Sequence, residues 1–223
     1  MSLLTTMKRL AAAFLGISMI LSSCVSAPWS VPHETGVYVQ TPGDSLPFWQ
    51  GVMTTATAVR YQARGSTTFC NVFVADTLRK YFGRETYEKA FPNGLKAPDV
   101  VYREWQSNPH LFLLDPKRYS LPQIQALADQ GSLVLLSYYY DKGKSHLAFV
   151  GNSRLDMFTI PPIERLEGVE ASRLSPAWLP AVVQAGTYTG VTSAVYASNG
   201  WLDSPVHPFK SGIVKFYLVE ASG

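Results

Sequence analysis

Cys70 and His146 are a pair of residues whose types and positions can support nucleophilic catalysis. Cys70 follows residues 65–68 (GSTT), whose hydroxyl groups suit helix capping, and lies in the first turn of a helical pattern. Unpaired backbone N–H groups and the helix dipole stabilise an anion there, so we expect a lowered pKa for the Cys70 thiol. His146 opens a strand directly after a turn, where its imidazole can reach a neighbouring helix N-terminus and act as the base.

Two amphipathic helices are expected to place the cysteine. The apolar spacing from Leu46 to Arg64 is compatible with a first helix. The pattern from Phe69 to Phe82 predicts a second helix, with Gly83 where a C-cap belongs. Four prolines prevent any long element in residues 84–120, which we expect to be irregular or partly helical, and Leu121 to Gln130 predicts a short helix.

Antiparallel strands are expected to place the histidine. Leu133 to Tyr140 is rich in apolar and aromatic residues, and a turn over residues 141–144 (DKGK) leads to its partner strand, His146 to Val150. Further strands are predicted at Ala181–Gln184, Val191–Tyr196 and Ile213–Val219. Because helices come first and an antiparallel set of strands follows, the predicted class is α+β.

The segments around both residues resemble those of papain-like cell-wall hydrolases. Residues 68–78 (TFCNVFVADTL) are similar to the cysteine segment of the NlpC-like and CHAP-like families, in which a Cys–small/polar–x–Phe–Val run starts the central helix. Residues 144–150 (KSHLAFV) resemble their histidine strand, usually Gly-His followed by alternating apolar residues, with Ser145 in place of the Gly. The resemblance covers roughly residues 67–186, including the Cys-then-His order. It implies a papain-like fold, with N-terminal helices carrying the cysteine packed on an antiparallel sheet carrying the histidine.

The resemblance also implies a third polar residue that orients the imidazole. Gln184 ends a strand that follows the histidine strand, and its amide can accept a hydrogen bond from the imidazole N–H. Asn199 competes for this role, because Asn followed closely by Trp is similar to the asparagine segment of papain. Asn152, two residues past the end of the histidine strand, is a further alternative.

An oxyanion hole would need the backbone N–H of Cys70 and one further donor. Gln62, eight residues upstream, is a candidate side-chain donor. No metal or cofactor is expected, because the remaining histidines have no metal-ligand spacing with one another or with acidic residues. They are His33, His110 and His207.

The N-terminus has the features of a lipoprotein signal. Lys8 and Arg9 precede an uncharged apolar stretch, residues 10–21, which is too short for the roughly 20 residues of a membrane span. Residues 21–24 (LSSC) resemble a lipobox, where bacteria attach lipid to the cysteine sulfur and cleave just before it. We therefore expect a signal peptide over 1–23, a lipid on Cys24, a tether over 24–45 and one domain over 46–223. Val25 in place of an Asp favours the outer membrane, facing the periplasm, if the host is Gram-negative.

The composition limits the classes of molecule that the protein is expected to bind. The 223-residue chain has a formal charge of +3, and loss of Lys8 and Arg9 with the signal leaves 17 basic against 16 acidic residues. This balance argues against nucleic acid, which demands a basic surface, and the length fits one domain, which we expect to be a monomer. The chain has two cysteines, so a lipid on Cys24 leaves Cys70 without a disulfide partner. A lone thiol in an oxidising compartment is either buried or kept for its reactivity.

The expected function is that of a lipid-anchored thiol amidohydrolase that cleaves peptide or amide bonds of peptidoglycan. Cys70 would attack the carbonyl as a thiolate, and His146 would protonate the leaving amine and later activate water. Two alternatives stay open. One is an acyltransferase or transpeptidase that uses the same pair and excludes water, and the other is a non-catalytic envelope-binding lipoprotein of the same fold.

Overall fold

The structure is a computed structural model that describes residues 36–56, 58–61, 69–141, 144–155, 180–185, 190–193, 209 and 211–221. All of them belong to one unit, residues 31–223. The expected signal peptide, Cys24, Gln62 and Asn199 lie outside the described residues. Within the described ranges, no helix combines the length and hydropathy that crossing a membrane requires.

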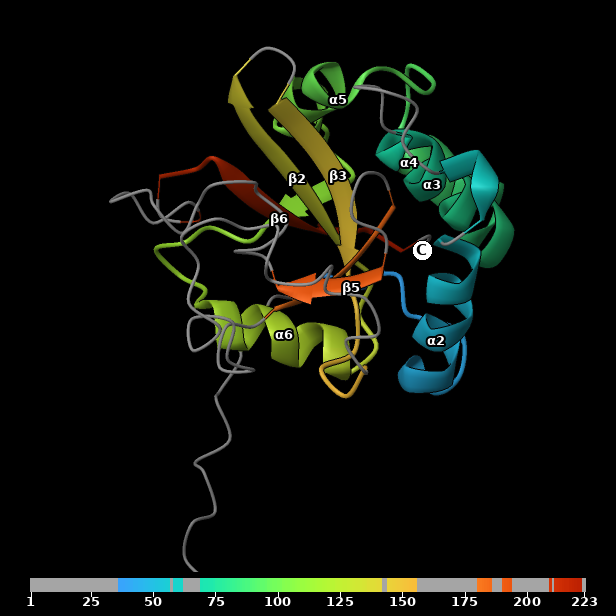
Figure 1. The fold of residues 1–223 in the computed structure, drawn as a ribbon. Helices are drawn as coiled ribbons and strands as arrows, with labels where there is room; N and C mark the ends of the chain where they lie inside the picture. The colour runs from blue at the N-terminus through green and yellow to red at the C-terminus, as the bar shows by residue number, and fades with distance from the viewer. Residues whose placement is uncertain are drawn as a thin grey trace, which may run out of the picture. The chain divides into compact units, whose positions relative to one another are not determined.

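Most of the helices precede most of the strands along the chain (Figure 1). The helices are α2 (Ser45–Ala56), α3 (Cys70–Thr77), α4 (Gly83–Ala90), α5 (Pro98–Trp105) and α6 (Leu121–Asp129), with a 3₁₀ turn at Val59–Tyr61 and a π-helical turn at Leu78–Phe82. The strands are β1 (Leu111–Leu113), β2 (Val134–Asp141), β3 (Lys144–Val150), β4 (Ala181–Gln184), β5 (Gly190–Ser193) and β6 (Val214–Val219). They pair antiparallel in the order β1-β6-β2-β3-β4-β5. The predicted α+β class is confirmed.

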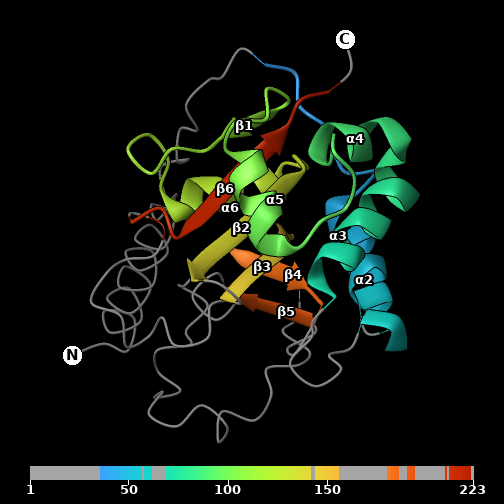
Figure 2. The same cartoon turned by 90° about the horizontal axis from the view of Figure 1, so that it is seen from above.

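The sheet separates two apolar clusters, because successive side chains of a strand point to opposite faces. Leu135 of β2 packs with the apolar residues of α2, α3, α4 and α5, whereas Val134 and Leu136 pack with those of α6. Figures 1 and 2 show α2, α3 and α4 grouped together beside the sheet, with α6 lying apart from this group. The helix that begins with Cys70 is thus held by the larger of the two clusters, against β3 and β4.

The helix expected from Phe69 to Phe82 begins at Cys70 and changes character before its end. Its α-helical part stops at Thr77, and a π-helical turn covers the last five residues of the expected range. Gly83 breaks the helix with a φ of 86°, a conformation that L side chains rarely adopt. The chain then enters α4 directly, so the segment expected to be irregular or partly helical is helical at its start.

The predicted tether over 24–45 is wrong at its C-terminal end. The backbone N–H of Val39 donates to Val219 O at 2.8 Å, and Leu133 donates to Val39 O at 2.8 Å. Thr41 likewise donates to Gly131 O at 2.7 Å, and α2 begins at Ser45. These bonds place residues 37–41 beside β6 and the start of β2, so this part of the chain belongs to the folded domain. The turn and proline signals of this segment did not reveal the pairing, because it depends on carbonyls far along the chain.

Gly151, directly after β3, allows the closest packing described in this part of the domain. A Cβ at this position would lie 2.6 Å from Val183 Cγ2 and 2.7 Å from Leu155 Cδ1, both buried. We expect Gly151→Ala to lower the free energy of unfolding by about 1–3 kcal/mol, because the neighbours must shift within a close-packed core. Urea unfolding measures this change.

Gly51→Ala is the matched control. Gly51 lies exposed in α2, and a Cβ there meets nothing within 4 Å. Since alanine is the better helix former, this variant should be more stable by about 0.5–1 kcal/mol. Equal effects of the two substitutions would contradict the packing described at Gly151.

Candidate active site

Cys70 is the first residue of α3, so it lies in the first turn as predicted, and the helix begins one residue after the expected start at Phe69. Phe69 precedes it as the N-cap residue without a side-chain cap, and its carbonyl accepts the Phe73 N–H at 2.9 Å. The Cys70 side chain is fully buried, and its thiol is not oxidised to a disulfide. A thiol at this position lies in the positive field of the helix N-terminus, which favours the thiolate.

Asn71 is a positioning residue that the sequence analysis did not single out. Its side-chain oxygen accepts the Val72 N–H at 2.9 Å, and its amide nitrogen donates to Lys96 O at 2.8 Å. The first bond satisfies a donor of the first turn, and the second ties the start of α3 to the segment that precedes α5. Its signal was an Asn directly after the cysteine, a residue type that favours bonds to nearby backbone at helix starts.

His146 is the third residue of β3 and pairs with Tyr138 of β2 across the hairpin. β3 pairs with β4 through Phe149↔Val183 and Val150↔Val182. These pairs lie at the C-terminal end of β3, away from the hairpin turn. Gln184 is buried.

The imidazole of His146 interacts with the side chains of both Cys70 and Gln184. Burial lowers the pKa of His146, but the negative charge of the Cys70 thiolate and hydrogen bonds to Cys70 and Gln184 outweigh it and raise the pKa above its usual value. Both partners therefore favour the imidazolium form. The sequence-predicted members Cys70, His146 and Gln184, from α3, β3 and β4, are thus brought together.

One ring nitrogen of the His146 imidazole lacks a good hydrogen bond within the described residues. Nε2 of His146 is buried and has no well-aligned hydrogen bond to any residue in the described part of the chain. Long or poorly aligned hydrogen bonds are common in active sites without substrate and shorten in the reacting complex. The same atom would otherwise be a costly unpaired group in the domain interior.

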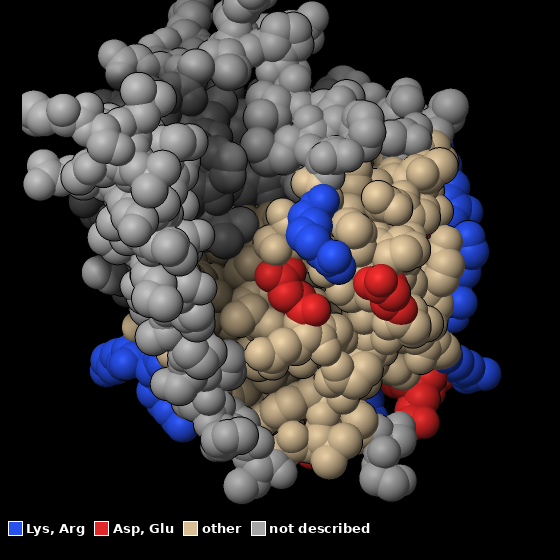
Figure 3. All heavy atoms as spheres, turned by 90° about the horizontal axis from the view of Figure 1, so that it is seen from below, with Lys and Arg blue, Asp and Glu red and all other residues tan. Residues whose placement is uncertain are grey.

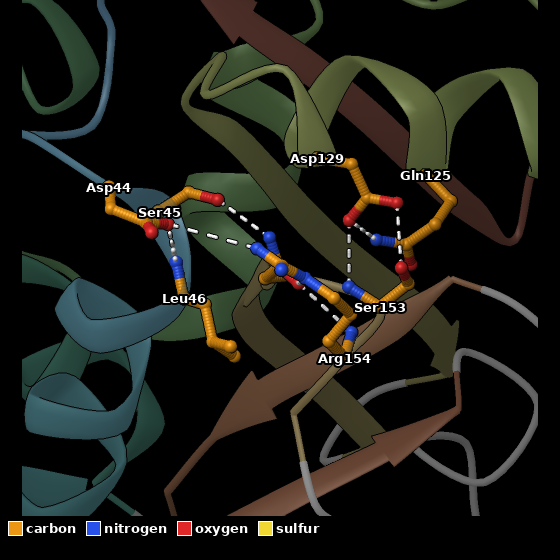
Figure 4. Close-up of polar contacts among 8 residues, drawn as sticks. Asp44, Ser45, Leu46, Gln125, Asp129, Ser153 and Arg154 are labelled. Atoms are coloured by element: carbon orange, nitrogen blue, oxygen red, sulfur yellow. Dashed lines mark hydrogen bonds and ion pairs between the residues drawn. The ribbon is translucent and has the colours of Figure 1, made fainter.

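A second amide, Gln125 of α6, holds the two strands that carry His146 and Gln184. Its side-chain nitrogen donates to Gly151 O at 2.9 Å and its oxygen accepts the Ala181 N–H at 2.7 Å, joining the end of β3 to the start of β4. Asp129 accepts from Gln125 at 2.9 Å and from the backbone and hydroxyl of Ser153, each at 2.7 Å (Figure 4). Gln125 is buried on the apolar side of α6. A polar residue at such a core position is a signal in the sequence, and the sequence analysis missed it.

Asn152 is wrong as an alternative orienting residue. Its amide nitrogen donates to Ser45 Oγ at 2.6 Å, and its side-chain oxygen accepts the Arg154 backbone N–H at 2.9 Å. Both polar ends of this buried side chain thus hold the start of α2 to the turn after β3. Its two partners, Ser45 and Arg154, are labelled in Figure 4. The other alternative, Asn199, and the candidate oxyanion donor Gln62 lie outside the described residues, so both stay predictions.

The ionisable groups of the described surface are dispersed. Acidic and basic side chains lie next to each other on an otherwise uncharged surface in the view of Figure 3. In the part of the chain that the structure describes, no three His, Cys, Asp or Glu residues are grouped as metal ligands would be. His110 contacts the Glu220 carboxylate at 3.3 Å on the surface.

Comparisons of the chain with protein-family models, curated proteins and solved structures find no match in any of the three. The arrangement of Cys70, His146 and Gln184 is therefore the basis for inferring a function.

Removing the thiol should change the titration of His146 in a defined direction. In Cys70→Ala, burial still lowers the pKa of His146, whereas the charge and hydrogen bond of Cys70 no longer raise it. We expect a lower pKa than in the wild-type protein, and a smaller decrease in Gln184→Ala. NMR titration of the imidazole protons measures both. An unchanged pKa in Cys70→Ala would show that the two side chains are not coupled.

Proposed function

We propose that the protein is a cysteine amidohydrolase with Cys70 as nucleophile, His146 as general base and acid, and Gln184 as the residue that orients the imidazole. The observation that carries this proposal is the interaction of one imidazole, whose Nε2 is buried, with both the Cys70 and the Gln184 side chains. Burying the Cys70 and Gln184 side chains is costly unless they are paired, and both interact with the imidazole. A papain-like fold is part of the proposal.

The residues can divide the reaction among them as follows. The Cys70 thiolate attacks the carbonyl carbon of an amide, and the imidazolium of His146 donates its proton to the leaving amine. An acyl-enzyme remains on the sulfur. His146, now neutral, takes a proton from water, which attacks the thioester and releases the acid, and the sulfur leaves as thiolate. Gln184 accepts from the imidazole N–H and holds one tautomer and orientation throughout.

Peptidoglycan is the substrate that we propose for this reaction. The segments around Cys70 and His146 resemble those of cell-wall hydrolases, and residues 21–24 resemble a lipobox. A lipid on Cys24 would hold the domain at the envelope, on the periplasmic face of the outer membrane in a Gram-negative host. There the cross-linked peptides of the wall are an abundant amide polymer within reach of a tethered enzyme.

Incubation of the full-length protein with purified muropeptides, followed by mass analysis, tests the proposal. Hydrolysis is expected as a gain of one water per cleaved bond, absent in Cys70→Ala. Cys24→Ala is the matched cysteine control and should retain hydrolysis, because soluble muropeptides do not need the anchor. Cleavage that persists in Cys70→Ala, or none with the wild-type protein, would refute the assignment. Products joined to an added amine in preference to water would identify the acyltransferase alternative.

The anchor has its own test. We expect labelled fatty acid to be incorporated into the wild-type protein in bacterial cells and to be lost in Cys24→Ala, with release of the protein from the membrane fraction. The sulfur of Cys24 is the expected attachment point, so Cys70→Ala should be labelled like the wild type. Incorporation that survives Cys24→Ala would show that the lipobox interpretation is wrong.

A further inference from the structure

A cavity of about 300 Å³ lies between the end of α2, the 3₁₀ turn at Val59–Tyr61 and the end of α3 with its π-helical continuation. This volume is at the lower end of the range of small-molecule sites, about 300–1,000 Å³. Six of its lining residues carry the argument: Arg60, Tyr61, Asp76, Thr77, Arg79 and Lys80. Cys70 begins the helix that Thr77 ends, so about 10 Å of helix separates the cavity from the thiol.

The lining has more positive than negative charge. Asp76 is its one described carboxylate, and it is already engaged: Arg60 Nη2 lies 3.0 Å from Oδ2, and the Tyr61 hydroxyl donates to the same oxygen at 3.0 Å. Arg79 is farther from this carboxylate, at 3.9 Å. Among the described residues Lys80 has no carboxylate partner, and its ammonium lies 4.6 Å from the Tyr81 ring centroid. One carboxylate against three cations leaves two uncompensated positive charges.

Arg79 is held ready for a ligand. Its guanidinium carbon lies 3.7 Å from the centroid of the Tyr87 ring, which fixes the guanidinium plane by stacking. Stacking of this kind occupies the face of the guanidinium and leaves its N–H groups directed sideways, where they can bind an oxyanion. The Arg79 side chain is about half exposed, so a ligand can reach it from solvent.

Thr77 supplies an independent sign of a missing ligand. It lines the same cavity and is only 1% exposed, yet its hydroxyl is buried without a hydrogen-bond partner in the described part of the chain. A threonine in a helix ordinarily bonds the carbonyl one turn back. A buried hydroxyl left unpaired is costly, and an oxygen of a bound ligand would satisfy it after a small shift of the lining side chains.

We propose that this cavity binds the phosphate group of a small molecule. A phosphate monoester carries close to two negative charges at neutral pH, which matches the two uncompensated cations. Its three terminal oxygens can accept from the Arg79 guanidinium, the Lys80 ammonium and the Thr77 hydroxyl together. A carboxylate has two oxygens and suits this set of donors less well. The site is separate from the Cys70–His146 pair, and the inference does not depend on the function proposed for that pair.

Calorimetric titration of the full-length protein at low ionic strength tests the site, with inorganic phosphate and glucose 1-phosphate as probes. Glucose and succinate are the controls for the sugar and for a dicarboxylate of similar charge. We expect at least one phosphate compound to bind more tightly than succinate, and Arg79→Gln and Lys80→Gln each to weaken it by about tenfold or more. Arg84→Gln is the matched control, because Arg84 is exposed, pairs with Glu88 and is not a lining residue.

Thr77→Val separates ligand binding from structure. Valine has nearly the shape of threonine and removes the unpaired hydroxyl, so the melting temperature without ligand should be unchanged or higher. Phosphate affinity should nevertheless fall by about tenfold. Lower stability with unchanged affinity, tighter binding of succinate, or no phosphate binding at millimolar concentration would overturn the proposal. Cys70→Ala should bind phosphate like the wild type, so a failure here is distinguishable from a failure of the proposed hydrolase.

Discussion

Cys70→Ala and His146→Ala are each expected to lower muropeptide turnover by about 10⁴-fold or more, and the double variant should be hardly slower than either single one. The reason is that the two side chains form one unit. Without the sulfur there is no covalent intermediate, and without the imidazole there is no group to exchange protons with the leaving amine and water. Rates of muropeptide cleavage for the three variants, followed by mass analysis, measure the effect.

His110→Ala is the matched control for His146→Ala. His110 is an exposed histidine that contacts Glu220, and its loss should leave turnover unchanged. Melting temperatures are needed as well, because Cys70 is fully buried and His146 lies among buried strand residues. If the rate reduction in the folded double variant equals the product of the two single reductions, the two residues act independently, and the proposed mechanism would then fail.

Gln184→Ala is expected to slow turnover by about 10²-fold or more while leaving measurable activity. This side chain orients the imidazole and supports its protonated form, but it makes and breaks no bond. The melting temperature should fall little by comparison. Turnover and thermal unfolding measured on the same preparations separate the two effects.

Asn152→Ala should behave in the opposite way. It removes bonds to Ser45 and Arg154, so we expect a loss of about 1–3 kcal/mol in the free energy of unfolding with turnover retained by the folded protein. Asn199→Ala should affect turnover much less than Gln184→Ala. If Asn199→Ala is instead the slow variant, the orienting role passes from Gln184 to Asn199.

The secondary structure that follows from local pattern was predictable. Ala181–Gln184 was expected as a strand and forms β4 with those bounds, and the short helix after residue 120 begins at Leu121 as expected. Local signals sufficed here: a run of apolar residues for β4, and Pro122 at an early helix position for α6. The structure adds a capping box of Ser120 with Gln123. β1 was missed, because three residues within a proline-rich segment carry no periodicity of their own and pair only with β6.

For the site, the sequence alone identified Cys70, His146 and Gln184 as residues of suitable type at the start of a helix and on two strands. Their types and local positions are properties of short segments, which is why pattern could find them. The sequence analysis preferred Gln184 to Asn152 but offered no contact that separates them, since both are amides close to strand ends. The tertiary structure decided between these two: Ser45, more than a hundred positions earlier, binds Asn152, while the imidazole interacts with Gln184.

The sequence by itself determined the α+β class, the helix that carries Cys70 in its first turn and the strand that carries His146, because hydrophobic period and turn residues act over a few neighbours. Only the tertiary structure decided which segments became neighbours in space. It paired residues 37–41 with β6 and the start of β2, joined β3 to β4 through Gln125, and left the Thr77 hydroxyl unpaired in a basic cavity. Hydrogen bonds between distant segments depend on the packing of the whole domain, so no local pattern encodes them.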